Sequence, residues 1–178
     1  MRTTRLLSLL LDADAIIGLH SFNLWNQISK QHRICIPPVI AEQAFFYEDK
    51  NGNRYPIDLS AHINQELSCN SEELLTFIEQ FDSIFKGELH DGDKELLLLL
   101  QKDEELILCT CDGAIIKALA LLALSDKGIS VEKLLKRSGI NKNLPHKYSE
   151  KRFRTLLKEG SIMRIQGIGL KRILKKKK

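Results

Sequence analysis

The stretch that decides the fold is LHDGDKELLLLLQKDEELILCTCD, residues 89–112. An apolar helical run, residues 96–100, follows Asp93 and ends at a charged turn. Residues 106–109 then form a short apolar strand, and Asp112 stands just beyond its end. In open α/β sheets, ligands bind outside the carboxyl ends of the strands. A carboxylate at this point therefore predicts a functional site that includes Asp112.

Two acids earlier in the chain occupy comparable positions. Asp12 directly follows the apolar run 6–11, and Glu42 lies in a helix predicted after the strand 33–36. Hard divalent cations bind oxygen ligands and usually keep several of their waters. Four carboxylates at the ends of predicted elements therefore indicate a site for Mg²⁺ or Mn²⁺, formed by Asp12, Glu42, Asp93 and Asp112.

The order of the predicted elements indicates the fold class. Apolar strand-like runs alternate with segments of helical spacing, which is typical of a mainly parallel sheet covered by helices. We therefore expect an α/β protein, a three-layer α/β/α sandwich. The predicted strands are residues 6–11, 33–36, 106–109 and 129–131. The predicted helices are residues 15–25, 39–47, 71–85, 93–100, 114–124, 132–137 and 150–158.

Two further glycine-containing segments give weaker signals. Asn51-Gly52 is typical of a type I′ hairpin turn. A strand is predicted after it over 54–59, and because this strand contains Pro56 we expect it at the edge of a sheet. Residues 161–169 are expected to be a strand or irregular. Their Gly167-Ile-Gly169 sequence weakly resembles the loops that bind phosphate backbones.

The charge is divided unevenly along the chain. Residues 1–126 carry 10 Lys and Arg against 20 Asp and Glu, whereas residues 127–178 carry 17 against 3. This division favours a domain over residues 1–135 that holds cations and a basic C-terminal extension over 136–178, a helix and a lysine-rich tail. A basic region of this kind attracts the nucleic-acid backbone. The candidate RNA contacts in it are Lys147, Lys151, Arg152, Arg154, Lys171 and Arg172; a solvated basic tail is the alternative.

Composition places the protein among ordinary globular proteins. It has 178 residues, of which 43% are hydrophobic and 28% charged, and no apolar run approaches the ~20 residues of a membrane span. Asp12 and Asp14 interrupt the apolar start, so we expect a buried strand there, a cytoplasmic protein and no membrane partner. Cys109 and Cys111 lack the spacing of a zinc or redox motif, and we expect both to be small core residues.

Taken together, four motifs resemble the PIN-domain nucleases. They are LLLDADAII (9–17), IPPVIAEQAF (36–45), LHDGDKELLLLL (89–100) and LILCTCDGAIIKAL (106–119), and they cover most of the chain. The resemblance implies a Rossmann-like sandwich and a Mg²⁺- or Mn²⁺-dependent endoribonuclease that hydrolyses RNA phosphodiester bonds. Such enzymes include RNA-processing nucleases and the toxins of toxin–antitoxin pairs, so an antitoxin protein and a homodimer are the partners that it suggests.

The resemblance also assigns roles to individual residues. Asp12, Glu42, Asp93 and Asp112 match the four acids of the family, which are both catalytic and metal-binding. Thr110 matches a small hydroxyl residue that holds a metal-bound water. Secondary candidates are Asp91 and Glu95, which flank Asp93, and His90 as a proton donor or phosphate contact.

Two other interpretations of the same residues remain open. One is a PIN-fold nucleic-acid-binding module that keeps its acids but has no catalytic activity. The other is a phosphotransfer or regulatory domain in which Asp12 and Asp14 hold Mg²⁺, although that reading leaves Glu42 without a role.

Overall fold

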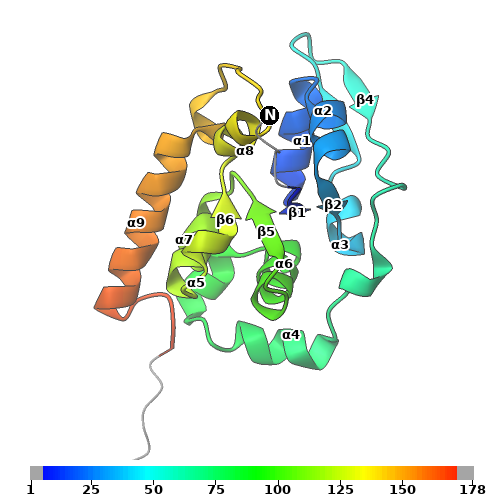
Figure 1. Cartoon of the computed structure of the whole chain (residues 1–178). Helices are drawn as coiled ribbons and strands as arrows, with labels where there is room; N and C mark the ends of the chain where they lie inside the picture. Colours follow the sequence, from blue (N-terminus) through cyan, green and yellow to red (C-terminus); the bar gives the residue numbers. More distant parts are fainter. Residues whose placement is uncertain (1–5, 172–178) are drawn as a thin grey trace, which may run out of the picture.

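A single parallel sheet lies at the centre of the protein (Figure 1). The computed structural model describes residues 6–171. In these residues the strands are ordered β2-β1-β5-β6, and all neighbouring pairs are parallel. The predicted α/β class with a mainly parallel sheet is therefore confirmed. The strands are β1 Ser8–Leu11, β2 Arg33–Cys35, β5 Leu106–Cys109 and β6 Gly128–Ile129.

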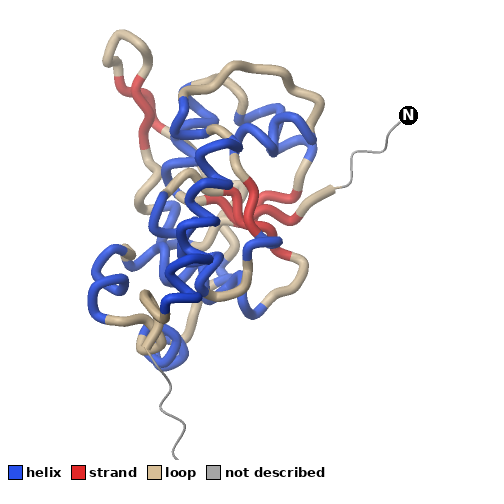
Figure 2. Tube along the Cα trace, turned by 90° about the vertical axis from the view of Figure 1, so that its left-hand side faces the viewer, coloured by secondary structure: helices blue, strands red, loops and turns tan. Residues whose placement is uncertain are grey.

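Both faces of the sheet are covered. Successive side chains of a strand point to opposite faces, yet Leu9 and Leu10 are both inaccessible to solvent, as are Leu108 and Cys109. Helices must therefore cover the sheet on each side, and Figure 2 shows the strands enclosed among helices. This arrangement is compatible with the expected three-layer sandwich.

The helices alternate with the strands. They are α1 Ala13–Ser21, α2 Trp25–Gln31, α3 Pro38–Ala41, α4 Ser71–Ile78, α5 Ser83–Glu88, α6 Asp91–Lys102, α7 Gly113–Leu121, α8 Val131–Arg137 and α9 Glu150–Gln166. Short 3₁₀ turns occur at Gln65–Leu67, Ser125–Lys127 and His146–Tyr148. Within residues 6–171, no helix is long and apolar enough to cross a membrane.

Three predicted helices have the wrong extent. The helix predicted over 15–25 is two helices, because Asn23 adopts a positive φ of 57° between α1 and α2. The helix predicted over 39–47 ends at Ala41, and its second half becomes β3, Phe46–Glu48. The helix predicted over 71–85 breaks after Ile78, because the Asp82 side chain caps a new helix by accepting from the Phe85 amide.

The hairpin forms, but not with the predicted type I′ turn. β3 pairs with β4, Arg54–Pro56, and the Asp49 amide donates to the Asn53 carbonyl at 2.9 Å. A type I′ turn needs positive φ at both central residues, and only Gly52 has it. Figure 2 shows this two-stranded hairpin standing apart from the central sheet.

The basic C-terminal helix is longer than predicted and packs on the rest of the protein. It passes through Gly160 and lies alongside α7, and its Phe153 belongs to the hydrophobic core (Figure 1). A Cβ on Gly160 would lie 2.5 Å from the Lys117 carbonyl oxygen. The predicted helix stops at residue 158, before Gly160, whereas in the structure Gly160 lies within α9 and allows α7 and α9 to approach closely.

The Gly167-Ile-Gly169 segment does not form a phosphate loop. Gly167 ends α9 with a φ of 70°, as glycine does at many helix ends. The amide of Gly169 donates to the carboxylate of Asp82 at 2.6 Å, and Leu170 bridges to Phe81. The segment therefore attaches the end of α9 to the start of α5.

The close approach of α7 and α9 gives a test of this packing. Gly160→Ala should destabilise the protein by about 1–3 kcal/mol, because the added methyl group overpacks the contact. Gly87→Ala is the matched control, since a Cβ there meets no atom within 4 Å in a solvent-exposed helix. Thermal unfolding should show a lower melting temperature for the first variant and an unchanged or higher one for the second. Equal melting temperatures would contradict the packing.

Candidate functional site

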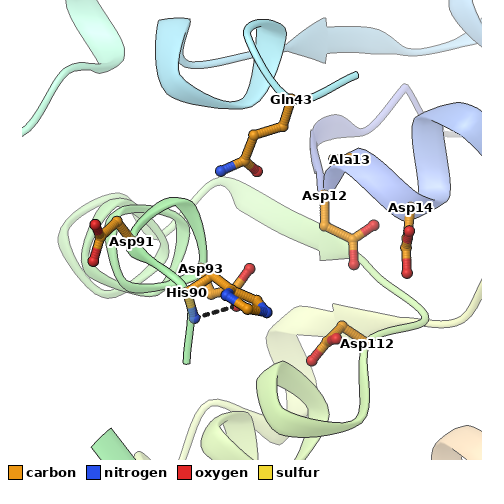
Figure 3. Close-up of a pocket in the computed structure, with 8 residues that line it drawn as sticks. All are labelled: Asp12, Ala13, Asp14, Gln43, His90, Asp91, Asp93 and Asp112. Atoms are coloured by element: carbon orange, nitrogen blue, oxygen red, sulfur yellow. Dashed lines mark hydrogen bonds between the residues drawn. The ribbon is translucent and has the colours of Figure 1, made fainter. Parts of the chain in front are cut away.

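An acidic pocket lies at the carboxyl ends of β1 and β5. Its volume is about 450 Å³, and side chains from the starts of α1, α6 and α7 point into it (Figure 3). The parallel pairing of β1 with β5 brings these ends together although they are about a hundred residues apart in sequence. The lining residues are Asp12, Ala13, Asp14, Gln43, His90, Asp91, Asp93 and Asp112.

Asp12 is the most buried carboxylate of the pocket, with 3% of its surface exposed. It follows β1 directly and caps α1, because its Oδ1 accepts from the Ala15 amide at 2.6 Å. Its Oδ2 accepts a short hydrogen bond from the hydroxyl of Thr110. Both carboxylate oxygens of Asp12 are thus held in place by the protein.

Thr110 connects Asp12 to Asp112. Its hydroxyl donates to Asp12 and accepts from the backbone amide of Asp112 at 3.0 Å. Asp112 in turn caps α7, since its Oδ1 accepts from the amides of Ala114 and Ile115. One fully buried hydroxyl therefore sets the positions of two acids.

Asp93 enters the pocket from the first turn of α6. Its Oδ2 accepts from the backbone amide of His90 at 2.8 Å, which closes the start of the helix (Figure 3). Asp93 is 8% exposed, and the apolar run behind it, residues 96–100, is buried. Burial of that run fixes the helix so that the acid faces the strands.

The pocket disfavours negative charge on its buried acids. Burial raises the pKa of Asp12 from 3.8 to about 7, although the bonds from Thr110 and Ala15 oppose the rise. Burial also raises the pKa of Asp93, and the charge of Asp112 adds to it. Near neutral pH, Asp12 is therefore poised to exchange its proton for a cation.

The structure does not bring every predicted acid to the pocket. Glu42 is exposed at the C-terminal end of α3 and is not among the lining residues. Glu95 instead accepts from the Cys69 amide at 2.9 Å. Asp91 lines the rim and pairs with Lys94 at 3.0 Å.

Two polar residues line the pocket without being among the four acids of the predicted metal site: Gln43, and Asp14, which is named only in the phosphotransfer alternative. Asp14 lies two positions after Asp12 in the first turn of α1, and this spacing was a usable signal. Gln43 follows the short α3. The direction of its side chain depends on where that helix ends, which the sequence pattern does not show.

Most of the candidate RNA contacts are engaged within the protein. Lys147 forms an ion pair with Asp14 at 2.7 Å, and Arg152 donates to the Cys111 carbonyl at 2.7 Å. Arg154 pairs with Glu150, and Lys171 pairs with Glu79. Lys151 is exposed, and Arg172 lies outside the described residues. Lys147 is thus the candidate that stands at the pocket.

The donor set suits a hard divalent cation, but the side chains do not converge on one point. Within residues 6–171, no three His, Cys, Asp or Glu side chains are placed to hold one ion together. In the same range, Asp12, Asp93 and Asp112 form no salt bridge, because the nearby lysines Lys94 and Lys147 pair with Asp91 and Asp14 instead. Mg²⁺ commonly binds through one or two carboxylates and several waters. Binding of this kind requires carboxylate oxygens but does not require three side chains to converge on the ion.

Comparison with known proteins identifies no family. No family model matches the sequence, and neither the curated proteins nor the solved structures include a significant match.

The raised pKa of Asp12 makes stability depend on pH. The folded protein binds this proton more tightly than the unfolded chain, so its stability falls as pH rises from about 4 to about 7. A shift of this size corresponds to at most about 4 kcal/mol. Asp12→Asn removes the ionisation and keeps a similar shape. With a chelator present, the melting temperature of the variant relative to wild type should therefore rise between pH 5 and pH 8.

Glu104→Gln is the control for this experiment, because Glu104 is exposed in the turn before β5, at the opposite end of the strand. It should show the wild-type pH profile. The same profile for Asp12→Asn would mean that Asp12 ionises freely in the folded protein.

Proposed function

We propose that the protein is a PIN-like, divalent-metal-dependent ribonuclease that hydrolyses phosphodiester bonds at the acidic pocket. The observation that carries the proposal is the buried Asp12, with its pKa near 7, joined through Thr110 to Asp112 and facing Asp93. Acids gathered at the carboxyl ends of parallel strands agree with the resemblance of the four sequence motifs to this family. Mg²⁺ or Mn²⁺ is the cofactor that this donor set favours.

The residues of the chain have distinct tasks in this scheme. Asp12, Asp93 and Asp112 would hold the metal, which when bound would supply an activated water and neutralise charge on the phosphate. Thr110 keeps Asp12 oriented. Three helices, α1, α6 and α7, begin at the pocket, and their N-terminal dipoles favour an anionic phosphate there. His90 at the rim is the candidate for a phosphate contact or proton donor.

Glu42 is the acid whose assignment rests on the resemblance alone. It is exposed, and its neighbour Gln43 lines the pocket in its place. Any part of Glu42 in holding the metal would therefore be the one that the resemblance implies. The toxin role, an antitoxin partner and a homodimer likewise rest on the resemblance.

A nucleic-acid-binding module without turnover is the second candidate. It is favoured by the separation of the acids, because no three of them within residues 6–171 are placed around one ion. The two candidates differ in one outcome, which is cleavage of RNA.

A cleavage assay on total RNA tests the proposed function. Wild type should cut RNA with Mg²⁺ or Mn²⁺ and stop when a chelator is added. Asp12→Asn and Asp112→Asn should each reduce the rate at least a hundredfold, Glu42→Gln should reduce it less, and Glu104→Gln should leave it unchanged. Equal background cleavage in wild type and Asp12→Asn, with RNA still bound, would favour the non-catalytic module.

The lysine-rich tail should guide RNA without taking part in the chemistry. Truncation after Lys171 is the suitable variant, because Leu170 and Lys171 still hold the end of α9 to residues 79–81. The truncation removes five cationic side chains. It should weaken RNA binding and flatten the slope of log affinity against log salt by at most about 3.5, which is about 0.7 for each of the five cations. If the truncated protein binds RNA at low salt as tightly as wild type does, the tail does not guide RNA.

A further inference from the structure

A second hollow adjoins the acidic pocket. Its volume is about 310 Å³, and it lies between α1 and the β3–β4 hairpin. Gln43 lines both cavities, so they are neighbours across one side chain. The hollow is lined by Ile17, Ser21, Gln43, Phe46, Tyr47 and Glu48.

Gln43 stands at the boundary between the two cavities. Its side chain reaches from the end of α3 toward the start of α6 (Figure 3). Gly92 makes room for it there, since a Cβ on Gly92 would lie 2.9 Å from the amide nitrogen of Gln43 and 3.0 Å from its oxygen. The amide thus lies close against the first turn of α6, between the carboxylates and the aromatic hollow.

Aromatic side chains form the far wall of the hollow. The guanidinium of Arg54 lies 4.6 Å from the centre of the Phe46 ring, and Phe45 meets that ring edge-on at 5.1 Å. Tyr47 stacks on both Tyr55 and His20. Phe46 is half-buried and lies outside the hydrophobic core, so part of its ring stays accessible at the hollow.

The arrangement fits a ring that stacks on one side and forms hydrogen bonds at its edge. Aromatic faces stack on any nucleobase, and Arg adds a cation–π contribution. The amide of Gln43 offers donors and an acceptor at the edge of this space. The Ser21 hydroxyl donates to the Ile17 carbonyl and the Glu48 carboxylate pairs with Arg54, so toward a base both offer acceptor oxygens. A base can enter such a hollow only when it is not paired in a duplex.

We infer that this hollow is the subsite for a nucleobase of single-stranded RNA next to the phosphate that is cut. Phe46 supplies the stacking surface, and Gln43 contacts the base edge and sets the preference among bases. This inference rests on the proposed function, because the neighbouring phosphate is placed in the acidic pocket. It predicts that the protein selects unpaired RNA and that the hairpin, not the lysine-rich tail, determines where it cuts.

Binding measurements test the stacking without any need for cleavage. Fluorescence anisotropy of labelled 10-nucleotide homopolymers is measured in chelator on the full chain. Phe46→Ala and Phe46→Leu should each weaken binding at least fivefold, whereas Phe46→Trp should restore it, because the ring rather than apolar volume is required. Ile165→Ala is the control, since this exposed residue of α9 lies outside both cavities. Binding unchanged by Phe46→Leu, or no binding by wild type, would overturn the subsite.

Mapping of cleavage sites tests the part played by Gln43. Gln43→Ala should shift the preferred base at the cut and raise KM, with kcat on a saturating short substrate changed less than threefold. Unchanged cut sites together with normal cleavage would refute the subsite and leave the nuclease standing. Base-dependent binding that is lost in Phe46→Leu, in a protein that never cuts, would refute the nuclease and leave the subsite standing.

Discussion

The hydroxyl of Thr110 is the contact on which the pocket depends. It donates to Asp12 at the end of β1 and accepts from the amide of Asp112 beyond β5. Because the two strands are parallel neighbours, this single side chain fixes the starts of α1 and α7 relative to each other. The third acid, Asp93, arrives on α6, whose direction is set by its buried leucines. The acids thus converge because the core requires the helices to lie where they do.

Placing carboxylates in this position has an energetic consequence. Burial of Asp12 penalises its charged form, and no cationic side chain within residues 6–171 forms a salt bridge with it. Hydrogen bonds from Thr110 and the Ala15 amide offset the penalty only in part. The ionised form of Asp12 therefore stays unfavourable until a proton or a cation binds to it. A carboxylate in this state is expected at a site that binds a metal reversibly. Lys147, paired with Asp14 at the rim, supplies positive charge nearby without neutralising Asp12.

Some features could be predicted from sequence because they depend on local pattern and burial. The apolar runs before Asp12 and Asp112 can only be strands covered on both faces, so the parallel sheet and two of the pocket acids follow from them. The pattern indicates Glu42 as a pocket residue, whereas Gln43 lines the pocket. This difference could not be predicted, because the end of the four-residue helix that begins at Pro38 depends on tertiary packing rather than on periodicity. Gly160 was misleading for a related reason. Its role is the close approach of α7, which is invisible in the residues around it.

The central claim is that Asp12 exchanges its proton for a divalent cation in this pocket. Calorimetric titration with Mn²⁺ at pH 6.5, repeated in buffers of different ionisation enthalpy, measures the protons released on binding. With a pKa of about 7, Asp12 holds about three-quarters of a proton at pH 6.5. Wild type should therefore release about that amount per metal and Asp12→Asn almost none, with much weaker binding in the variant. Equal affinity and equal proton release in the two proteins would show that the cation binds elsewhere, and would contradict the account.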